Sequence, residues 1–460
     1  MSIEILSYLT GLLLLLWFAP PLLFLAVFLA LCLVLSNWQD AAPEPALVSL
    51  LQRQVIEPAR EQNGYFAWVG VMGPADQEPL AWGQRWFLEA RRLDVGAGPA
   101  DTAAAHPMDR ELRQGTDSAA QIPCASQPGR CLELTRKDPA QARAILERGA
   151  LTLARAEVAL ALDYYQEPRW AGMSLERFHY FRQPSQWSGL SGTRFALAVA
   201  EGRDREALAQ LAREMDFYRR QLAGSVTLVS KMVALAWMER SYQFLNQYLR
   251  QAPDGARKHR ALLLQMLAPL PEAAVDMRTV LETEFLMLRN GLMSLNPGRE
   301  LQLPQGQLLE RLHFFYLPQA TVNSHFRQTQ VLLALENSRG ADYIHRAARL
   351  GQQHEAGLEP DWFLPRNLVG RILLQVGQPN WSTYFLRRDD LLVWRQVVAL
   401  QLDMLESGLG VAEVVDQALL EGRLAHPFSG QSPDWNLKSR HLVYGARPER
   451  REGMALEIRL

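Results

Sequence analysis

The hydrophobic pattern of the chain begins with an apolar run without charged residues, from Ile5 to Leu35. A helix over this run would be about 46 Å long at ~1.5 Å per residue, and the hydrocarbon core of a bilayer is about 30 Å thick. The run is therefore long enough to cross a membrane once, with tilt, and too short to cross twice. Pro20 and Pro21 should kink it. We expect residues 1–40 to form an N-terminal membrane anchor with one transmembrane helix.

A cleaved signal peptide is the alternative for this run. An uncleaved anchor is favoured because no Lys or Arg precedes Arg53, the run is about twice the length of a signal-peptide core, and no A-x-A motif follows it directly. The side of the membrane is open. The basic residues Arg53 and Arg60 lie after the run, which favours a cytoplasmic position for the bulk of the chain.

The cysteines favour the opposite side. Cys124 and Cys131 are the only cysteines outside the apolar run, and six residues lie between them. They fit a disulfide that closes a small loop in an oxidising compartment, with two free thiols as the alternative. A zinc site would need further nearby ligands, so we expect no metal and no cofactor. On balance, the sequence predicts a single-pass bacterial inner-membrane protein with most of its chain in the periplasm.

Residues 41–137 are expected to form a spacer and a loop-rich segment. Ala41–Pro45 predicts a short spacer and Ala46–Arg60 an emerging helix. Gly64–Met72 is aromatic and β-branched between turn residues, which predicts a strand or a buried extended segment. Asp94–Arg136 is rich in Gly, Pro, Asp, Ser and Thr and predicts a long surface loop.

Residues 138–296 have helical periodicity and predict a domain of stacked helical hairpins. The first helix should begin at Asp138-Pro139, where Asp caps and Pro suits the first turn, and end before Pro168. Gly202–Leu208 resembles the turn of a tetratricopeptide-type repeat, but no 34-residue period persists. Further helices are expected from Asp204 to just before a Gly224 cap, from a Ser225 cap to Gln251, at 256–268 and at 271–295.

The second half should contain a Pro/Gly-rich connection at 297–319, a second helical region at 320–410, and a short helix with a β-hairpin at 411–460. Helices are expected at 320–337, 341–353 and 389–406. Arg440–Tyr444 and Met454–Leu460 have strand character and predict the hairpin. The predicted fold class is mainly α, with an N-terminal transmembrane helix followed by stacked helical hairpins and a small C-terminal β-hairpin.

The composition and motifs assign no reaction. The 48 Lys+Arg and 49 Asp+Glu nearly cancel, which argues against a nucleic-acid partner. No Walker, H-E-x-x-H, G-x-S-x-G or strand-linked G-x-G-x-x-G motif is present, so no catalytic residue can be named. Asp276, Glu282 and Glu284 could supply a glycosidase acid and base, although Arg278 can simply pair with Glu282 on a helix surface. Four tryptophans could line a groove or fill the core: Trp170, Trp187, Trp237 and Trp394.

Three short segments carry a resemblance: Asn63-Gly64-Tyr65, Asn367–Leu374 and His426–Gly430. They look like segments of uncharacterised, single-span bacterial envelope proteins. The last is similar to a D-P-F-S/T-G turn that precedes a terminal hairpin in exported proteins of unknown activity, and His426 stands where Asp is usual. The resemblance implies an envelope location and no known reaction.

Our leading hypothesis is therefore a membrane-anchored envelope protein that acts as a protein-binding scaffold or accessory factor through its helical domain. It has a membrane partner through residues 5–35 and a protein partner. The alternative is a periplasmic hydrolase acting on a glycan or peptide. A deep cleft with converging carboxylates would favour the hydrolase, and an exposed apolar face would favour the scaffold.

Overall fold

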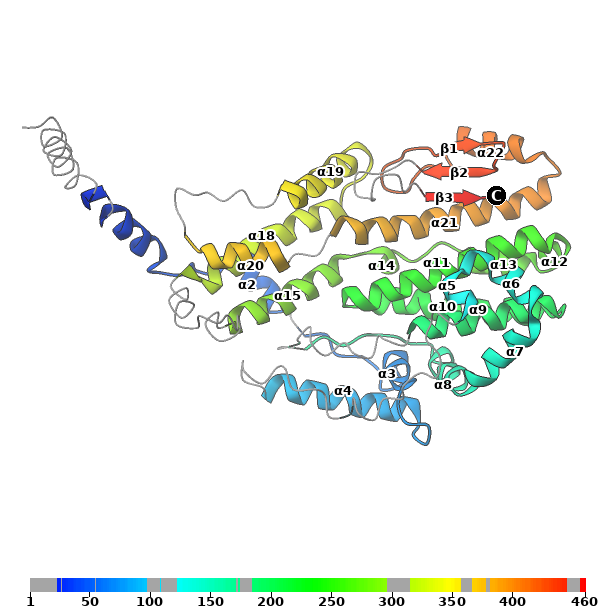
Figure 1. Cartoon of the computed structure of the whole chain (residues 1–460), viewed down its shortest axis with the longest axis horizontal. Helices are drawn as coiled ribbons and strands as arrows, with labels where there is room; N and C mark the ends of the chain where they lie inside the picture. The colour runs from blue at the N-terminus through cyan, green and yellow to red at the C-terminus, as the bar shows by residue number, and fades with distance from the viewer. Residues whose placement is uncertain are drawn as a thin grey trace, which may run out of the picture. The chain divides into compact units, whose positions relative to one another are not determined.

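The computed structural model is mainly helical, with one small three-stranded antiparallel sheet (Figure 1). The chain divides into two units, each built from separate stretches of sequence. The first comprises Met1–Ser49, Gly291–Gln328 and Ala356–Pro379, and the second comprises Leu50–Asn290, Thr329–Glu355 and Asn380–Leu460. The structure describes residues 23–25, 27–53, 55–96, 108, 122–170, 173, 184–295, 315–356, 366–377, 381–444 and 456–460.

The strand predicted for Gly64–Met72 is wrong, because this segment forms helix α3 (Gly64–Gly70). Asn63 caps it by accepting the Tyr65 amide, and all seven helical residues are buried against its neighbours. Its partner is α4 (Pro79–Gly96), which it meets at glycines: a Cβ on Gly70 would lie 1.8 Å from the Pro79 carbonyl oxygen. Tertiary packing therefore overrides the strand propensity of aromatic and β-branched residues.

The predicted surface loop is also wrong over residues 122–136, the part that the structure describes continuously. This stretch forms α5 (Pro123–Ser126), a 3-10 turn η3 (Pro128–Arg130) and α6 (Cys131–Lys137). Ile122 and Leu132 are buried. Residues 97–107 and 109–121 of the predicted loop lie outside the described residues.

The helix predicted from Asp138 begins as expected and then divides in two. Asp138 accepts the Gln141 amide at 2.9 Å and caps α7 (Pro139–Arg148). Gly149 separates α7 from α8 (Ala150–Leu160), and a Cβ at Gly149 would lie 2.4 Å from the Leu190 side chain. The glycine thus admits close packing at the break.

The long helices of the second unit confirm the predicted helical hairpin. α9 (Pro184–Ala200) is followed by α10 (Asp204–Gly224) and α11 (Leu228–Gln251). The side chain of Thr227, rather than Ser225, caps α11 by accepting the Ser230 amide. Gly202, with φ of 74°, makes the turn before α10. Trp68 anchors the aromatic core among these helices, 5.1 Å from the Trp237 ring.

Apart from α20 (Leu368–Gly377), which was not predicted, the remaining helices follow the predicted order with shifted ends. Two predicted helices are each divided, and the one expected to start at Asp389 begins eight residues earlier. Their bounds are α12 (Pro253–Lys258), α13 (Arg260–Met266), α14 (Glu272–Val275), α15 (Arg278–Ser294), α18 (Pro318–Glu336), α19 (Gly340–Ala356), α20 (Leu368–Gly377), α21 (Trp381–Ser407) and α22 (Val411–Leu420).

The two strands of the predicted C-terminal β-hairpin are confirmed as β2 (His441–Tyr444) and β3 (Leu456–Arg459), and an unpredicted strand, β1 (Asp434–Asn436), joins them. The order is β1-β2-β3, and Leu442 faces Ile458 across the antiparallel pair. Both side chains are completely buried. Residues 445–455, which connect β2 and β3, lie outside the described residues.

In the first unit, residues 27–37 are helical, and α2 (Pro45–Leu51) is shorter than the predicted helix at 46–60. Much of the predicted anchor, residues 1–22 and 26, lies outside the described residues. Within the described parts of the chain, no helix combines the length and apolar character needed to cross a membrane.

Candidate functional site

The end of the apolar run is bonded directly into the first unit. Asn37 is 3% exposed; its side-chain amide donates to the Leu33 carbonyl at 3.0 Å, and its side-chain oxygen accepts the Asn367 amide at 2.9 Å. One side chain thus connects the last turn of the apolar helix to the start of α20. The Arg366 guanidinium adds a bond to the Gln39 carbonyl at 3.1 Å.

The predicted spacer at Ala41–Pro45 is held in place by α18. Just before it, Asp40 accepts the first free amides of α18, those of Gln319 at 2.7 Å and Ala320 at 2.9 Å. A carboxylate at this position satisfies backbone donors and suits the positive end of the helix dipole. Asn323 then donates to the Ala42 carbonyl at 2.8 Å. We call the bonded residues 37–44, 319–327 and 366–367 the anchor joint.

The structure accounts for two residues of the Asn367–Leu374 segment, Asn367 and Gly370. Asn367 has a φ of 53°, in the left-handed region, which Asn tolerates better than most residues, and its side chain is 6% exposed. Its side-chain oxygen accepts the Leu317 amide at 2.8 Å. A Cβ on Gly370 would lie 2.0 Å from the Thr321 hydroxyl oxygen, so glycine is needed for this approach.

Before the joint, the described part of the apolar helix exposes nine large apolar side chains. Their exposed fractions range from 37% for Val34 to 75% for Phe24. Trp38, at the end of the helix, is 70% exposed. The exposed apolar residues are Leu23, Phe24, Leu25, Val27, Phe28, Leu29, Leu31, Val34 and Leu35.

The second unit contains a buried charged cluster between α18, α19 and α21. Arg388 and Asp389 are both 0% exposed. Asp389 accepts from the Tyr343 hydroxyl at 2.5 Å and from the Arg388 guanidinium at 2.9 Å. Arg388 also donates to Glu336, whose second oxygen accepts the Met277 amide at 3.3 Å. The carboxylates raise the pKa of Arg388 against the opposing effect of its burial.

The His426–Gly430 turn packs on this cluster. His426 accepts the Phe428 and Ser429 amides through Nδ1, at 3.3 and 3.0 Å. These are the bonds that an Asp carboxylate makes in a turn of this kind, so His can replace Asp without losing them. With Nδ1 as acceptor, the neutral ring carries its proton on Nε2, 3.6 Å from Asp389. The Arg388 guanidinium lies 3.7 Å from the centre of the Phe428 ring.

Two further carboxylates converge on the N-terminus of α11. Glu167, which is completely buried, accepts the Val226 amide at 2.7 Å and the Thr227 amide at 3.0 Å. Glu284 from α15 accepts the next amide, that of Leu228, at 2.8 Å. Burial raises the pKa of Glu167. Burial, together with the Glu167 charge, raises the pKa of Glu284 to about 7.

Lys231, one turn further along α11, is buried without a direct carboxylate contact. Its ammonium group donates to the Leu222 carbonyl at 2.6 Å and to the Ala273 carbonyl at 3.1 Å. Burial lowers its pKa to about 7. Burial at the start of α11 therefore favours the neutral form of the Lys231 amine.

The acidic group predicted from sequence is not brought together. Asp276 accepts the Arg278 amide at 2.9 Å and caps α15, while Glu284 binds α11. Glu282 acts electrostatically on Arg169. The four candidate tryptophans are buried, as the core interpretation requires: Trp170, Trp187, Trp237 and Trp394 are 7, 1, 3 and 9% exposed.

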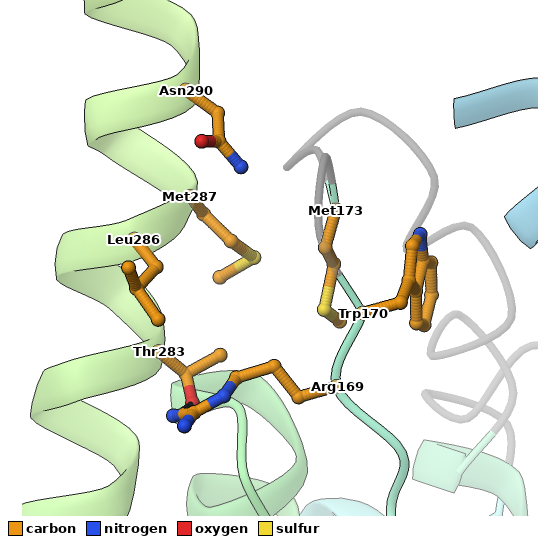
Figure 2. A pocket seen from close by; sticks show the side chains of 7 residues that line it. All are labelled: Arg169, Trp170, Met173, Thr283, Leu286, Met287 and Asn290. Carbon is orange, nitrogen blue, oxygen red and sulfur yellow. Dashed lines mark hydrogen bonds between the residues drawn. The ribbon is translucent and has the colours of Figure 1, made fainter. Parts of the chain in front are cut away.

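The described residues line two hollows of very different size. Figure 2 shows one of about 10 Å³, with α15 side chains on one side and Arg169, Trp170 and Met173 on the other. Arg169 donates to the Thr283 hydroxyl at 2.9 Å. This volume suits a single water molecule. A second, open hollow of about 970 Å³ is lined by the turn before α10, the start of α10 and the helix α12, with Asp204, Glu206 and Asp254 among its residues. Among the described residues, no group of His, Cys, Asp and Glu is arranged to hold a metal ion.

The structure contains a disulfide between Cys124 and Cys131, with Cα atoms 4.7 Å apart. Both residues are buried in α5 and α6 rather than in a surface loop. The oxidising compartment that this pair implies stays a prediction.

Sequence reasoning missed the anchor joint and the Arg388 cluster. The charged run Arg387–Asp390 lies within an otherwise apolar stretch of α21, and that interruption was the available signal. No protein-family model, curated protein or solved structure matches this chain.

Proposed function

We propose that the protein is a single-pass membrane protein anchored through residues 5–35, and that its helical body binds a protein partner in the bacterial envelope. The main support for the anchor is the apolar helix before the joint, which exposes nine large apolar side chains between Leu23 and Leu35. Burying one such side chain is worth about 1.5–3 kcal/mol, so a lipid environment would stabilise this helix strongly.

The arrangement of charged groups supports a binding role over hydrolysis. A glycosidase needs two carboxyl groups about 5–9 Å apart across a cleft. Here Glu284 and Asp276 are committed to backbone amides, and Asp389 is completely buried beneath the His426 turn. These contacts stabilise the fold and commit these three carboxylates to structural roles.

The location in the periplasm is part of the same proposal. The buried Cys124–Cys131 disulfide supports an oxidising compartment. A C-terminal fusion to a reporter active only in the periplasm should be active. Activity only of a cytoplasmic reporter would contradict this placement.

Membrane anchoring is tested by replacing Leu25 and Leu29 together with Arg in the full chain. Each Arg costs about 2.5–3.5 kcal/mol at the centre of a membrane helix, so the variant should be released from membranes by alkaline carbonate, whereas the parent chain stays. The matched control replaces Leu409 and Leu420, also exposed, with Arg. Equal retention of both variants, or release of the parent chain, would contradict anchoring.

The binding role is tested against the hydrolase alternative with the purified full chain in detergent. A scaffold should form a complex of defined stoichiometry with an envelope protein and leave peptidoglycan and peptides intact. Turnover of either substrate by the parent chain, lost in Glu284→Gln, would favour the hydrolase.

A further inference from the structure

The anchor joint leaves almost no chain between the apolar helix and the folded first unit. Leu35 is 63% exposed and belongs to the apolar run, while Asn37 is already buried and bonded to Asn367. Two residues span at most about 7 Å. The headgroup layer on each side of the hydrocarbon core is about 5–8 Å thick. The joint therefore lies within the headgroup layer wherever Leu35 reaches the edge of the core.

Two side chains at the exit of the helix suit such a position. Trp38 is 70% exposed, and tryptophan is enriched at membrane interfaces because its ring is apolar and its N–H is polar. Arg366 is also exposed, and it donates to the carbonyl of Gln39, the residue after Trp38, at 3.1 Å. A guanidinium has five N–H donors in a geometry that matches phosphate.

We propose that the face formed by Trp38 and Arg366 contacts the membrane surface, with Trp38 in the headgroup layer and Arg366 binding a phospholipid phosphate. This proposal rests on the membrane anchoring proposed above and adds a fixed orientation to it. Because the joint replaces a flexible linker with hydrogen bonds, the first unit is held against the lipid instead of diffusing on a tether.

The apolar run is longer than the hydrocarbon core, so the bilayer edge could fall earlier than Leu35. That position would leave the apolar side chains between Phe28 and Leu35 in water, at a cost of about 1.5–3 kcal/mol for each large one. About 20 apolar residues suffice to span the core, so a span that ends at Leu35 keeps these side chains in the hydrocarbon. The edge after Leu35 is therefore favoured.

The test places nitroxide labels on the full chain, in a Cys32→Ala background, in vesicles of phosphatidylethanolamine and phosphatidylglycerol. A cysteine introduced at Leu31, Trp38 or Arg366 carries the label, while Cys124 and Cys131 stay in their disulfide. Collision with oxygen and with a water-soluble nickel chelate reports depth, and loss of the lipid phosphorus NMR signal reports proximity to phosphate. Gln375, exposed near the other end of α20, is the control position on the same helix, which leads away from the exit (Figure 1).

The expected result is a label at Leu31 within the hydrocarbon, a label at Trp38 at headgroup depth, and greater loss of phosphorus signal from Arg366 than from Gln375. A lipid-buried label at Leu31 with water-exposed labels at Trp38 and Arg366 would overturn the headgroup contact and leave the anchor intact. Equal loss of signal from Arg366 and Gln375 would also overturn it. A water-exposed label at Leu31 would overturn the anchor and this contact together.

Discussion

Glu284→Gln is expected to make the protein more stable at high pH. The substitution removes a titratable carboxyl group and keeps an oxygen that can accept the Leu228 amide. Burial and the Glu167 charge raise the pKa of Glu284 from 4.5 to about 7 in the folded protein. Between these values the folded chain retains a proton that the unfolded chain has lost. The stability of the parent chain therefore falls as the pH rises through this window.

The magnitude follows from the two pKa values. Within the window the free energy of unfolding changes by about 1.4 kcal/mol per pH unit. Without solvent screening, the parent chain would therefore lose about 2.5 kcal/mol of stability between pH 5 and pH 8. The Glu284 side chain keeps partial contact with solvent, which screens part of this effect. We expect the free energy of unfolding of Glu284→Gln, relative to the parent chain, to increase by about 1–2 kcal/mol between these pH values.

The assay is denaturant unfolding of the full chain in detergent, followed by tryptophan fluorescence at several pH values. Burial lowers the pKa of Lys231 from 10.5 to about 7, so its own contribution rises with pH above 7. That contribution is present in both proteins and cancels in the comparison. The same stability difference at pH 5 and pH 8 would refute the assignment of a raised pKa to Glu284.

Three further substitutions test the packing. Gly83→Ala should destabilise the protein by about 3 kcal/mol or more, because the new Cβ would lie 1.9 Å from the Phe66 carbonyl oxygen. The control Gly129→Ala, with open space around the new Cβ, should change the stability little. Equal melting temperatures of the two variants would contradict the close packing of α3 and α4. Arg388→Met should cost about 3–5 kcal/mol by leaving two buried carboxylates without their cation, and a variant as stable as the parent in urea would disprove that pairing. Replacing Cys131 with Ala should cost about 2–3 kcal/mol if the disulfide forms in the cell, and alkylation of Cys124 or Cys131 in the unfolded parent chain without a reductant would show that it does not.

The sequence predicted those parts of the fold that depend on residues close together along the chain. The Asp138 cap, helix α10 and the terminal strands are each predicted by residues within a few positions of one another. The N-terminal cap of α11 was placed two residues too early, at Ser225. That error is small because Ser and Thr both cap helices, and the final choice depends on the path of the preceding turn.

Tertiary contacts decided the candidate site. Asn37 and Asn367 are 330 positions apart, and nothing in either local sequence announces their hydrogen bond. His426 shows the same limit, since its place in the turn was visible but its acceptor role depends on which ring nitrogen faces the amides.

The amino-acid sequence by itself determined that the chain is mainly helical, that it ends in antiparallel strands, and that its first residues are too apolar to face water favourably. These are properties of periodicity and composition, which neighbouring residues carry. Only the tertiary structure decided that an aromatic segment at Gly64 is a helix, that Ala41–Pro45 is held rather than free, and that the buried charges are paired. Those outcomes depend on contacts between segments that are distant in sequence. Burial of a side chain stabilises the protein only when folding brings the group that it contacts close to it.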